Sequence, residues 1–161
     1  MNYPFTLERE QWVPRPLDEV FSFFSDAKNL EALTPPWMRF HILSPQPIEI
    51  AAGTIIDYRL SWHGIPLRWK TEITTWEPPN CFVDLQLKGP YRLWHHTHRF
   101  RASAGGTQIL DSVQYALPFG VLGRLVHTLS VRRNVEEIFE YRRRKVSALF
   151  GRDERAEKEH P

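Results

Sequence analysis

Two histidines and one aspartate are the residues of this sequence whose types and spacing best suit chemistry. His96 and His98 lie two residues apart in a segment of alternating pattern, so on a strand both rings point to the same side. A two-residue turn at Gly105-Gly106 predicts that Asp111 lies diagonally across a hairpin from His98. The pattern therefore predicts two imidazoles and a carboxylate on one face of a sheet.

Three interpretations of this group remain open. Two imidazoles and a carboxylate could hold zinc or iron. Asp111 could instead orient and charge His98, which would then transfer protons on a bound ketone or phenol. The interpretation that we favour is a hydrogen bond between His98 and Asp111 that gives an apolar pocket its polar contact. We accordingly expect no bound metal.

Other classes of site find little support in the composition. The single cysteine, Cys81, excludes an intramolecular disulfide and a multi-cysteine metal site, and it favours a reducing cytoplasm. No glycine-rich phosphate loop occurs, so we expect no cofactor. The net charge of +2 is too small to indicate nucleic-acid binding. We expect neither a signal peptide nor a membrane-spanning helix, because no window approaches the roughly 20 apolar residues that a bilayer requires.

The elements that must position these residues can be inferred from the hydrophobic pattern. Residues 5–13 alternate apolar and polar and stop at Pro14, which predicts a strand. Two short helices follow, and the Pro35-Pro36 pair ends the second. Residues 40–117 have period two and are broken by turn signals, which predicts about six antiparallel strands.

The last long segment, residues 120–150, has apolar residues at helical spacing and predicts a helix of about 45 Å. We therefore expect an α+β fold in a single domain of residues 3–150, followed by a charged, disordered tail of residues 151–161. The basic residues of the helix allow a transient contact with a membrane surface.

The turns predict which strand residues share the covered face. A two-residue loop at His63-Gly64 places Tyr58 opposite Trp69, Leu60 opposite Leu67 and Trp62 opposite Ile65. A loop at Gly105-Gly106 places Phe100 opposite Asp111, His98 opposite Val113 and His96 opposite Tyr115. The predicted pocket lining is Tyr58, Leu60, Trp62, Leu67, Trp69, Val83, Leu85, His96, His98, Asp111, Val113 and Tyr115.

Several local motifs resemble one known superfamily. They are the run from Gln11 to Pro16, Glu19-Val20-Phe21, the run from Gly89 to Phe100, Gly105-Gly106-Thr107, Asp111, and the run from Tyr115 to Pro118. In these runs and in its order of elements, the chain resembles the SRPBCC superfamily, which includes START lipid-transfer domains, plant pollen allergens and polyketide cyclases. The resemblance implies a helix-grip fold, in which a curved antiparallel sheet of about seven strands wraps around a long C-terminal helix, with two short helices after the first strand.

The resemblance implies a cavity but no shared catalytic set, so it leaves the function open. We favour binding of a hydrophobic or aromatic small molecule between the sheet and the C-terminal helix, for transport or sequestration rather than catalysis. One alternative is a polyketide cyclase or dehydratase-like lyase that uses His98 and Asp111 for proton transfer. Another is an accessory module for an epimerase-like partner protein, because some bacterial relatives are fused to such a domain.

Overall fold

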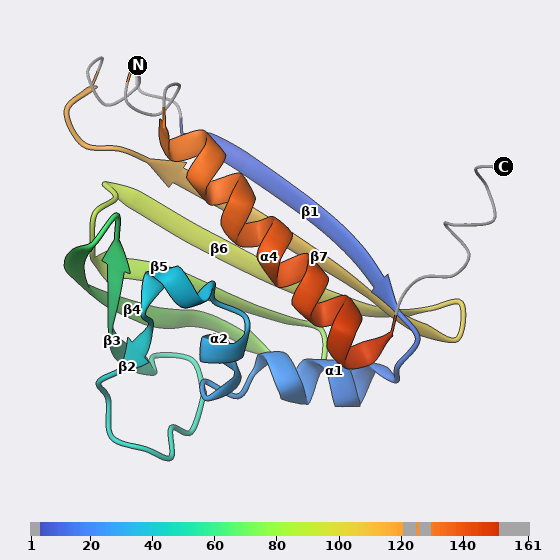
Figure 1. The fold of residues 1–161 in the computed structure, drawn as a ribbon. Helices are drawn as coiled ribbons and strands as arrows, with labels where there is room; N and C mark the ends of the chain where they lie inside the picture. The colour runs from blue at the N-terminus through green and yellow to red at the C-terminus, as the bar shows by residue number, and fades with distance from the viewer. Residues whose placement is uncertain (1–3, 121–124, 126–129, 152–161) are drawn as a thin grey trace, which may run out of the picture.

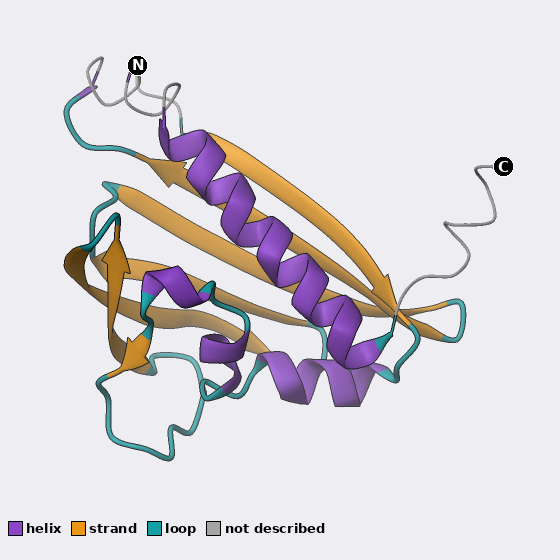
Figure 2. Ribbon diagram, viewed as in Figure 1, coloured by secondary structure: helices purple, strands orange, loops and turns teal. Residues whose placement is uncertain are grey.

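The computed structural model describes residues 4–120, 125 and 130–151. Its elements follow the predicted order of one strand, short helices, a meander and a long helix (Figures 1 and 2). They are β1 (Phe5–Val13), α1 (Leu17–Phe24), α2 (Asn29–Ala32), η1 (Pro36–Met38), β2 (His41–Ile42), β3 (Ile55–Trp62), β4 (Ile65–Glu77), β5 (Cys81–Lys88), β6 (Leu93–Ser103), β7 (Gly106–Ala116) and α4 (Arg132–Phe150).

The strands form one antiparallel sheet of seven strands in the order β1-β7-β6-β5-β4-β3-β2. Helix α4 crosses one face of this sheet diagonally, and α1 lies beside its C-terminal end (Figure 1). This arrangement confirms the predicted α+β helix-grip fold. None of the helices in the described part of the chain has the length and apolar character that crossing a membrane requires.

The β3–β4 hairpin has the predicted register, with Tyr58 opposite Trp69 and Leu60 opposite Leu67. Its loop residues His63 and Gly64 both have positive φ, at 48° and 80°. Two consecutive residues of positive φ match the right-handed twist of the flanking strands, which is why such a short loop closes the hairpin cleanly.

The β6–β7 hairpin differs from the prediction by one position. Its loop is Ala104-Gly105, with φ values of 48° and 78°, so Ser103 pairs with Gly106. The predicted pairs were therefore wrong: His98 lies directly opposite Asp111, His96 opposite Val113 and Phe100 opposite Ile109. Gly106 serves packing instead of the turn, because a Cβ there would collide with the Val13 carbonyl and the Trp12 ring.

Helix α4 has 19 residues, which corresponds to about 28 Å, and it occupies the C-terminal part of the predicted range 120–150. Residues 121–124 and 126–129 of that range lie outside the described residues, as do residues 152–161 of the predicted tail. The buried side of α4 ends at Phe150, whereas Leu149 is 49% exposed. The buried residues of α4 are Val135, Phe139, Val146 and Phe150.

Both ends of α4 pack tightly against the rest of the chain. Near its C-terminal end, Val146 and Phe150 join a cluster with α1 and with Phe100 and Ile109. Near its N-terminal end, a second cluster joins Val135 and Phe139 to β1 and β7. A third cluster, over β3 and β4, has no buried residue from α4; its buried members are Ala27, Phe40, Ile56, Tyr58, Leu60 and Trp69. The helix therefore packs closely on the β1–β7 side, whereas none of its buried residues joins the core cluster over β3 and β4.

Candidate functional site

A cavity of about 180 Å³ lies on the β3–β6 side of the sheet. Helix α4 covers it with Ile138, Phe139 and Arg142, and the segment from α1 to η1 supplies the rest of the cover. For comparison, an apolar cavity of about 150 Å³ accommodates a benzene ring. The cavity is therefore wide enough for a ring-sized ligand. The aromatic residues that line it are Phe24, Phe40, Tyr58, Trp69, Phe82, Tyr91, Trp94 and Phe139.

The aromatic rings of this wall contact one another in ordered pairs. The Tyr58 and Trp69 rings are stacked with their centroids 6.0 Å apart, and Trp94 meets Trp69 edge-on at 5.5 Å. The Trp69 indole nitrogen Nε1 is buried and has no hydrogen-bond partner among the described residues. A buried donor without a partner carries a cost in stability, which the ring contacts of this wall must offset.

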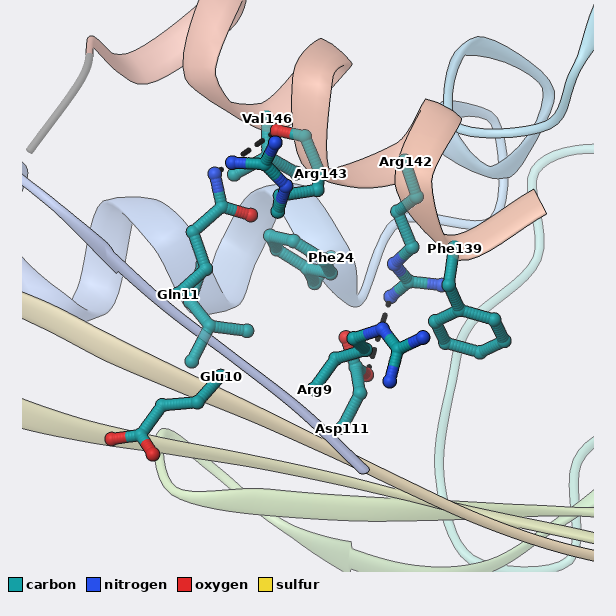
Figure 3. Close-up of a pocket in the computed structure, with 10 residues that line it drawn as sticks. Arg9, Glu10, Gln11, Phe24, Asp111, Phe139, Arg142, Arg143 and Val146 are labelled. Atoms are coloured by element: carbon teal, nitrogen blue, oxygen red, sulfur yellow. Dashed lines mark hydrogen bonds and ion pairs between the residues drawn. The ribbon is translucent and has the colours of Figure 1, made fainter. Parts of the chain in front are cut away.

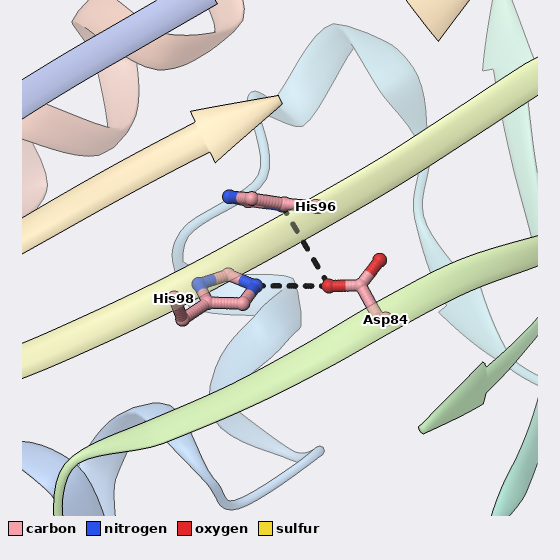
Figure 4. Close-up of side chains that lie close together, drawn as sticks. All are labelled: Asp84, His96 and His98. Carbon is pink, nitrogen blue, oxygen red and sulfur yellow. Dashed lines mark hydrogen bonds and ion pairs between the residues drawn. The ribbon is translucent and has the colours of Figure 1, made fainter. Parts of the chain in front are cut away.

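A cluster of polar side chains forms the floor of the cavity. His96 and His98 come from β6, Asp111 from the facing position on β7, and Asp84 from β5, where it pairs with His96 in the register. The imidazoles are 6% and 5% exposed, and the carboxylates of Asp84 and Asp111 are 18% and 10% exposed. Four ionisable groups are thus brought together from three adjacent strands. Figure 4 shows Asp84, His96 and His98 among them.

Each imidazole lies between the two carboxylates. His98 Nε2 is 2.8 Å from Asp84 Oδ2, and His98 Nδ1 is 2.9 Å from Asp111 Oδ1. His96 Nε2 donates to the same Asp111 oxygen at 2.9 Å, while His96 Nδ1 is 3.7 Å from Asp84 Oδ2. Asp111 therefore holds both rings from one side, and Asp84 faces them from the other.

Arg142 adds a positive charge from α4. Its Nη2 atom lies 3.7 Å from Asp111 Oδ1 and 3.3 Å from His98 Nδ1, so the guanidinium covers Asp111 (Figure 3). The guanidinium also lies 5.0 Å from the centre of the Phe24 ring, a distance typical of a cation–π contact. Its side chain is only 12% exposed, so the charge is largely withdrawn from water.

The two histidines respond to this environment in opposite directions. Burial and the nearby charge of His98 lower the pKa of His96 to about 4, although the bond to Asp111 opposes this shift. Burial also acts to lower the pKa of His98, but its hydrogen bonds to Asp111 and Asp84 outweigh burial and raise it. In the chain without a ligand, His98 therefore binds a proton more strongly than His96 does, and His96 is neutral at pH 7.

Both carboxylates remain ionised because of their partners. Burial acts to raise the pKa of Asp111, but Arg142 and the two histidine hydrogen bonds lower it well below its usual range. The pKa of Asp84 is lowered in the same way, against the effect of burial, by the His98 hydrogen bond and the nearby positive charges. Arg142 and the histidine hydrogen bonds thus stabilise two negative carboxylates at the floor of the cavity.

Five of the predicted pocket residues line the cavity: Tyr58, Leu60, Trp69, His96 and His98. Asp111 lies behind the histidines, where it borders a recess of about 20 Å³ between β1 and α4 (Figure 3). The remaining predicted residues on these strands pack into the core clusters instead of lining the cavity; they are Trp62, Leu67, Val113 and Tyr115.

The predicted face of β5 was wrong. Val83 and Leu85 alternate with Phe82 and Asp84, and it is Phe82 and Asp84 that line the cavity. The sequence pattern assigned the apolar residues to the inside, but in this strand the interior holds a carboxylate that pairs with buried histidines. The neighbouring strand β4 is also irregular: Ile73 pairs with Asp84 but Thr75 pairs with Val83, the adjacent β5 residue. A regular alternation of inward and outward residues therefore does not continue along β4.

Sequence reasoning missed Asp84 and Arg142 as members of the cluster. Arg142 had a usable signal, since it lies three residues after Phe139 and four before Val146 on the buried stripe of α4. No such signal in the sequence indicated Asp84. The connection between β5 and β6 is too long to be a two-residue turn, so it does not predict how these two strands pair. Only the folded sheet shows that Asp84 is opposite His96.

A family model described as "Polyketide cyclase / dehydrase and lipid transport" matches residues 13–139. No curated protein sequence matches the chain. The structural comparisons, by contrast, find many similar folds. Three of these structures are 10–13% identical to the chain, so they bear on the fold alone.

One similar structure is the Zhui aromatase/cyclase from Streptomyces sp. R1128, with a TM-score of 0.65 and 13% identity over 91% of this chain and 96% of that one. Another is the major latex-like protein 151 from Panax ginseng, with a TM-score of 0.67 and 10% identity over 92% and 98% of the two chains. A third, protein CV1439 from Chromobacterium violaceum, has a TM-score of 0.72 and 12% identity over 92% and 98%. The fold of this chain is thus shared by bacterial and plant proteins.

Proposed function

The chain belongs to the polyketide cyclase / dehydrase and lipid transport family, and we propose that it binds a hydrophobic, aromatic small molecule in the cavity between β3–β6 and α4. The observation that carries this proposal is a cavity of about 180 Å³ that is walled by aromatic rings and has polar groups at its floor. Burying about 200 Å² of apolar ligand surface contributes roughly 5 kcal/mol before the cost of association.

The polar groups of the cavity define which part of a ligand must be polar. The Asp84 side chain lines the cavity, is 18% exposed and can accept a hydrogen bond from a ligand hydroxyl. His96 and His98 line the floor beside it, and their ring nitrogens face Asp84 and Asp111. A ring system that bears a hydroxyl group therefore fits this site better than a long, unsubstituted acyl chain.

Filling the cavity tests the proposal. Leu60→Trp places a larger side chain in the lining, and we expect it to lower the affinity for the fluorescent dye 8-anilinonaphthalene-1-sulfonate by at least about tenfold, because the added ring takes the ligand's volume. Leu85→Trp is the matched control on the opposite face of the sheet. Calorimetric titration of both variants measures the affinity, and equal binding by wild type and Leu60→Trp would contradict the proposal.

A second candidate function is cyclase-like proton transfer on a bound substrate. The observation that favours it is that His98 lies within hydrogen-bond distance of two carboxylates while it lines the cavity. His98→Ala and Asp111→Ala separate the two functions. If the protein is an enzyme, the wild type turns over an aromatic polyketide-like substrate, and the two variants lose this turnover but still bind the substrate. If it is a binding protein, the wild type itself shows no turnover.

Transport or sequestration is the form of binding that we favour, and it requires no catalytic group. A transient membrane contact by α4 stays a prediction, and several of its basic residues are already paired: Arg132 with Glu136 at 3.1 Å and Arg133 with Glu137 at 2.9 Å. The epimerase-like partner and the cytoplasmic location also stay predictions from the sequence.

A further inference from the structure

We infer that Asp84, His96 and His98 form a binding site for one divalent transition-metal ion, such as Zn²⁺ or Fe²⁺, at the floor of the cavity. The inference goes beyond the binding of an apolar ligand and does not depend on it. It rests on four features of the polar cluster: how the donor atoms converge, how Asp111 orients the rings, what net charge the cluster carries, and which way the site faces.

The three donor groups converge on one point. Their ligand atoms all lie within 4.8 Å of one another. Asp84 Oδ2 is 2.8 Å from His98 Nε2 and 3.7 Å from His96 Nδ1 (Figure 4). In a tetrahedral zinc site with bonds of about 2.0–2.1 Å, neighbouring donors are about 3.4 Å apart, and the two observed distances lie on either side of that value. Small side-chain rotations therefore suffice to admit an ion.

Asp111 holds both imidazoles in the orientation that metal binding requires. Its Oδ1 atom is 2.9 Å from His96 Nε2 and 2.9 Å from His98 Nδ1. With Nε2 directed at Asp111, His96 presents Nδ1 to Asp84. For His98, Nδ1 lies against Asp111 Oδ1 and Arg142 Nη2, and Nε2 faces Asp84. A carboxylate behind a metal-binding histidine commonly sets the tautomer and the ring orientation in this way. One carboxylate here does so for two rings.

The charge of the cluster suits a divalent cation. With both imidazoles neutral, Asp84, Asp111 and Arg142 carry a net charge of −1, because Arg142 offsets Asp111 at 3.7 Å. A divalent ion brings the total to +1. The remaining positive charge would favour an anionic oxygen of the ligand, such as a phenolate, an enolate or a carboxylate.

The free coordination position faces the cavity. Asp84, His96 and His98 all line the cavity, whereas Asp111 lies behind them. Three protein donors with an open position are typical of catalytic zinc sites and of the two-histidine, one-carboxylate iron sites. The sequence had placed Asp111 in the donor set and indicated no metal; the fold brings Asp84 to the donor position and makes Asp111 a positioning residue.

Metal titration of the intact chain tests the inference directly. Wild-type protein is stripped with a chelator and titrated with Zn²⁺ in competition with a chromophoric chelator, and we expect one ion per chain. X-ray absorption of the zinc-loaded wild type should show two imidazole nitrogens and oxygen donors. This measurement needs no variant, so it remains decisive even where a substitution impairs folding.

Variants identify the donors. Asp84→Asn and His98→Gln should abolish stoichiometric binding, while Asp111→Asn should weaken it by about 10- to 100-fold, as is typical for groups that orient a ligand. His95→Gln, which replaces the half-buried histidine adjacent on β6, is the matched control and should bind like wild type. Circular dichroism confirms that each variant is folded.

Two results would overturn the inference: the absence of stoichiometric binding by wild type, or unchanged binding by folded Asp84→Asn. Dye binding by the chelator-treated wild type separates this inference from the proposed function. If the metal-free chain binds 8-anilinonaphthalene-1-sulfonate in the cavity but no zinc, the metal site alone is wrong. If it binds zinc but not the dye, the proposed ligand binding alone is wrong.

Discussion

At the scale of single residues, the polar cluster depends on balanced buried charges. Asp111 receives hydrogen bonds from two histidines and faces Arg142, whose side chain is 12% exposed. Removing one member of a buried charge pair leaves the other desolvated without compensation, which costs much more than losing an exposed pair. Arg142 and its neighbour Arg143 allow this difference to be measured within one helix.

Arg142→Met retains most of the apolar length of the side chain but removes its charge. We expect it to lower the free energy of unfolding by about 3 kcal/mol, because Asp111 then remains buried without its cation. Arg143→Met removes an exposed pair with Glu140 and should cost less than about 1 kcal/mol. Urea unfolding measures both values, and equal losses would show that the buried charge is not what Arg142 stabilises.

At the scale of elements, the β6–β7 hairpin positions His98 opposite Asp111. Its register depends on two adjacent glycines that serve different purposes. Gly105 has a φ of 78° and open space around it, so it satisfies the turn. Gly106 is buried against the Val13 carbonyl and the Trp12 ring, so it allows β1 to approach β7.

The two glycines should respond differently to substitution. Gly106→Ala should lower the free energy of unfolding by about 2 kcal/mol, because a backbone carbonyl cannot move aside for a methyl group. Gly105→Asn should stay within about 1 kcal/mol of wild type, because asparagine tolerates positive φ. Thermal unfolding provides the comparison. A larger loss for Gly105→Asn would mean that the turn, and not the contact with β1, sets the register.

At the scale of the whole molecule, α4 serves both the core and the cavity. Phe139 is buried against β1 and β7 on one side and lines the cavity on the other, while its ring lies 5.5 Å from that of His96. Phe150 is similarly buried, but it packs with α1 away from the cavity lining. The same substitution at these two positions therefore separates stability from ligand binding.

Phe139→Ala and Phe150→Ala should each lower the free energy of unfolding by about 3–5 kcal/mol, the usual cost of a cavity in a core. Only Phe139→Ala should enlarge the ligand cavity, so only this variant should gain affinity for a bulkier aromatic dye relative to 8-anilinonaphthalene-1-sulfonate. The ratio of the two affinities, measured below the unfolding temperature of each variant, is the readout. If both variants had the same ratio of dye affinities, the ligand would bind outside the cavity that Phe139 lines.

Local signals in the sequence determined the order of the elements and the register of one hairpin. Alternation, prolines and turn residues act over a few positions, so Tyr58 opposite Trp69 could be derived from the loop at His63-Gly64. The same signals brought His96 and His98 to one face of a strand, and the fold then placed them at the floor of a cavity.

The tertiary structure alone decided which side chains complete the cluster. Asp84 reaches the histidines through a strand pairing that no short turn predicts, and Arg142 reaches Asp111 through the packing of α4 across the sheet. Hydrophobic pattern assigns charged residues to the outside, because an isolated buried charge is costly. Here the charges compensate one another inside the fold, and that compensation exists only once β5, β6, β7 and α4 have come together.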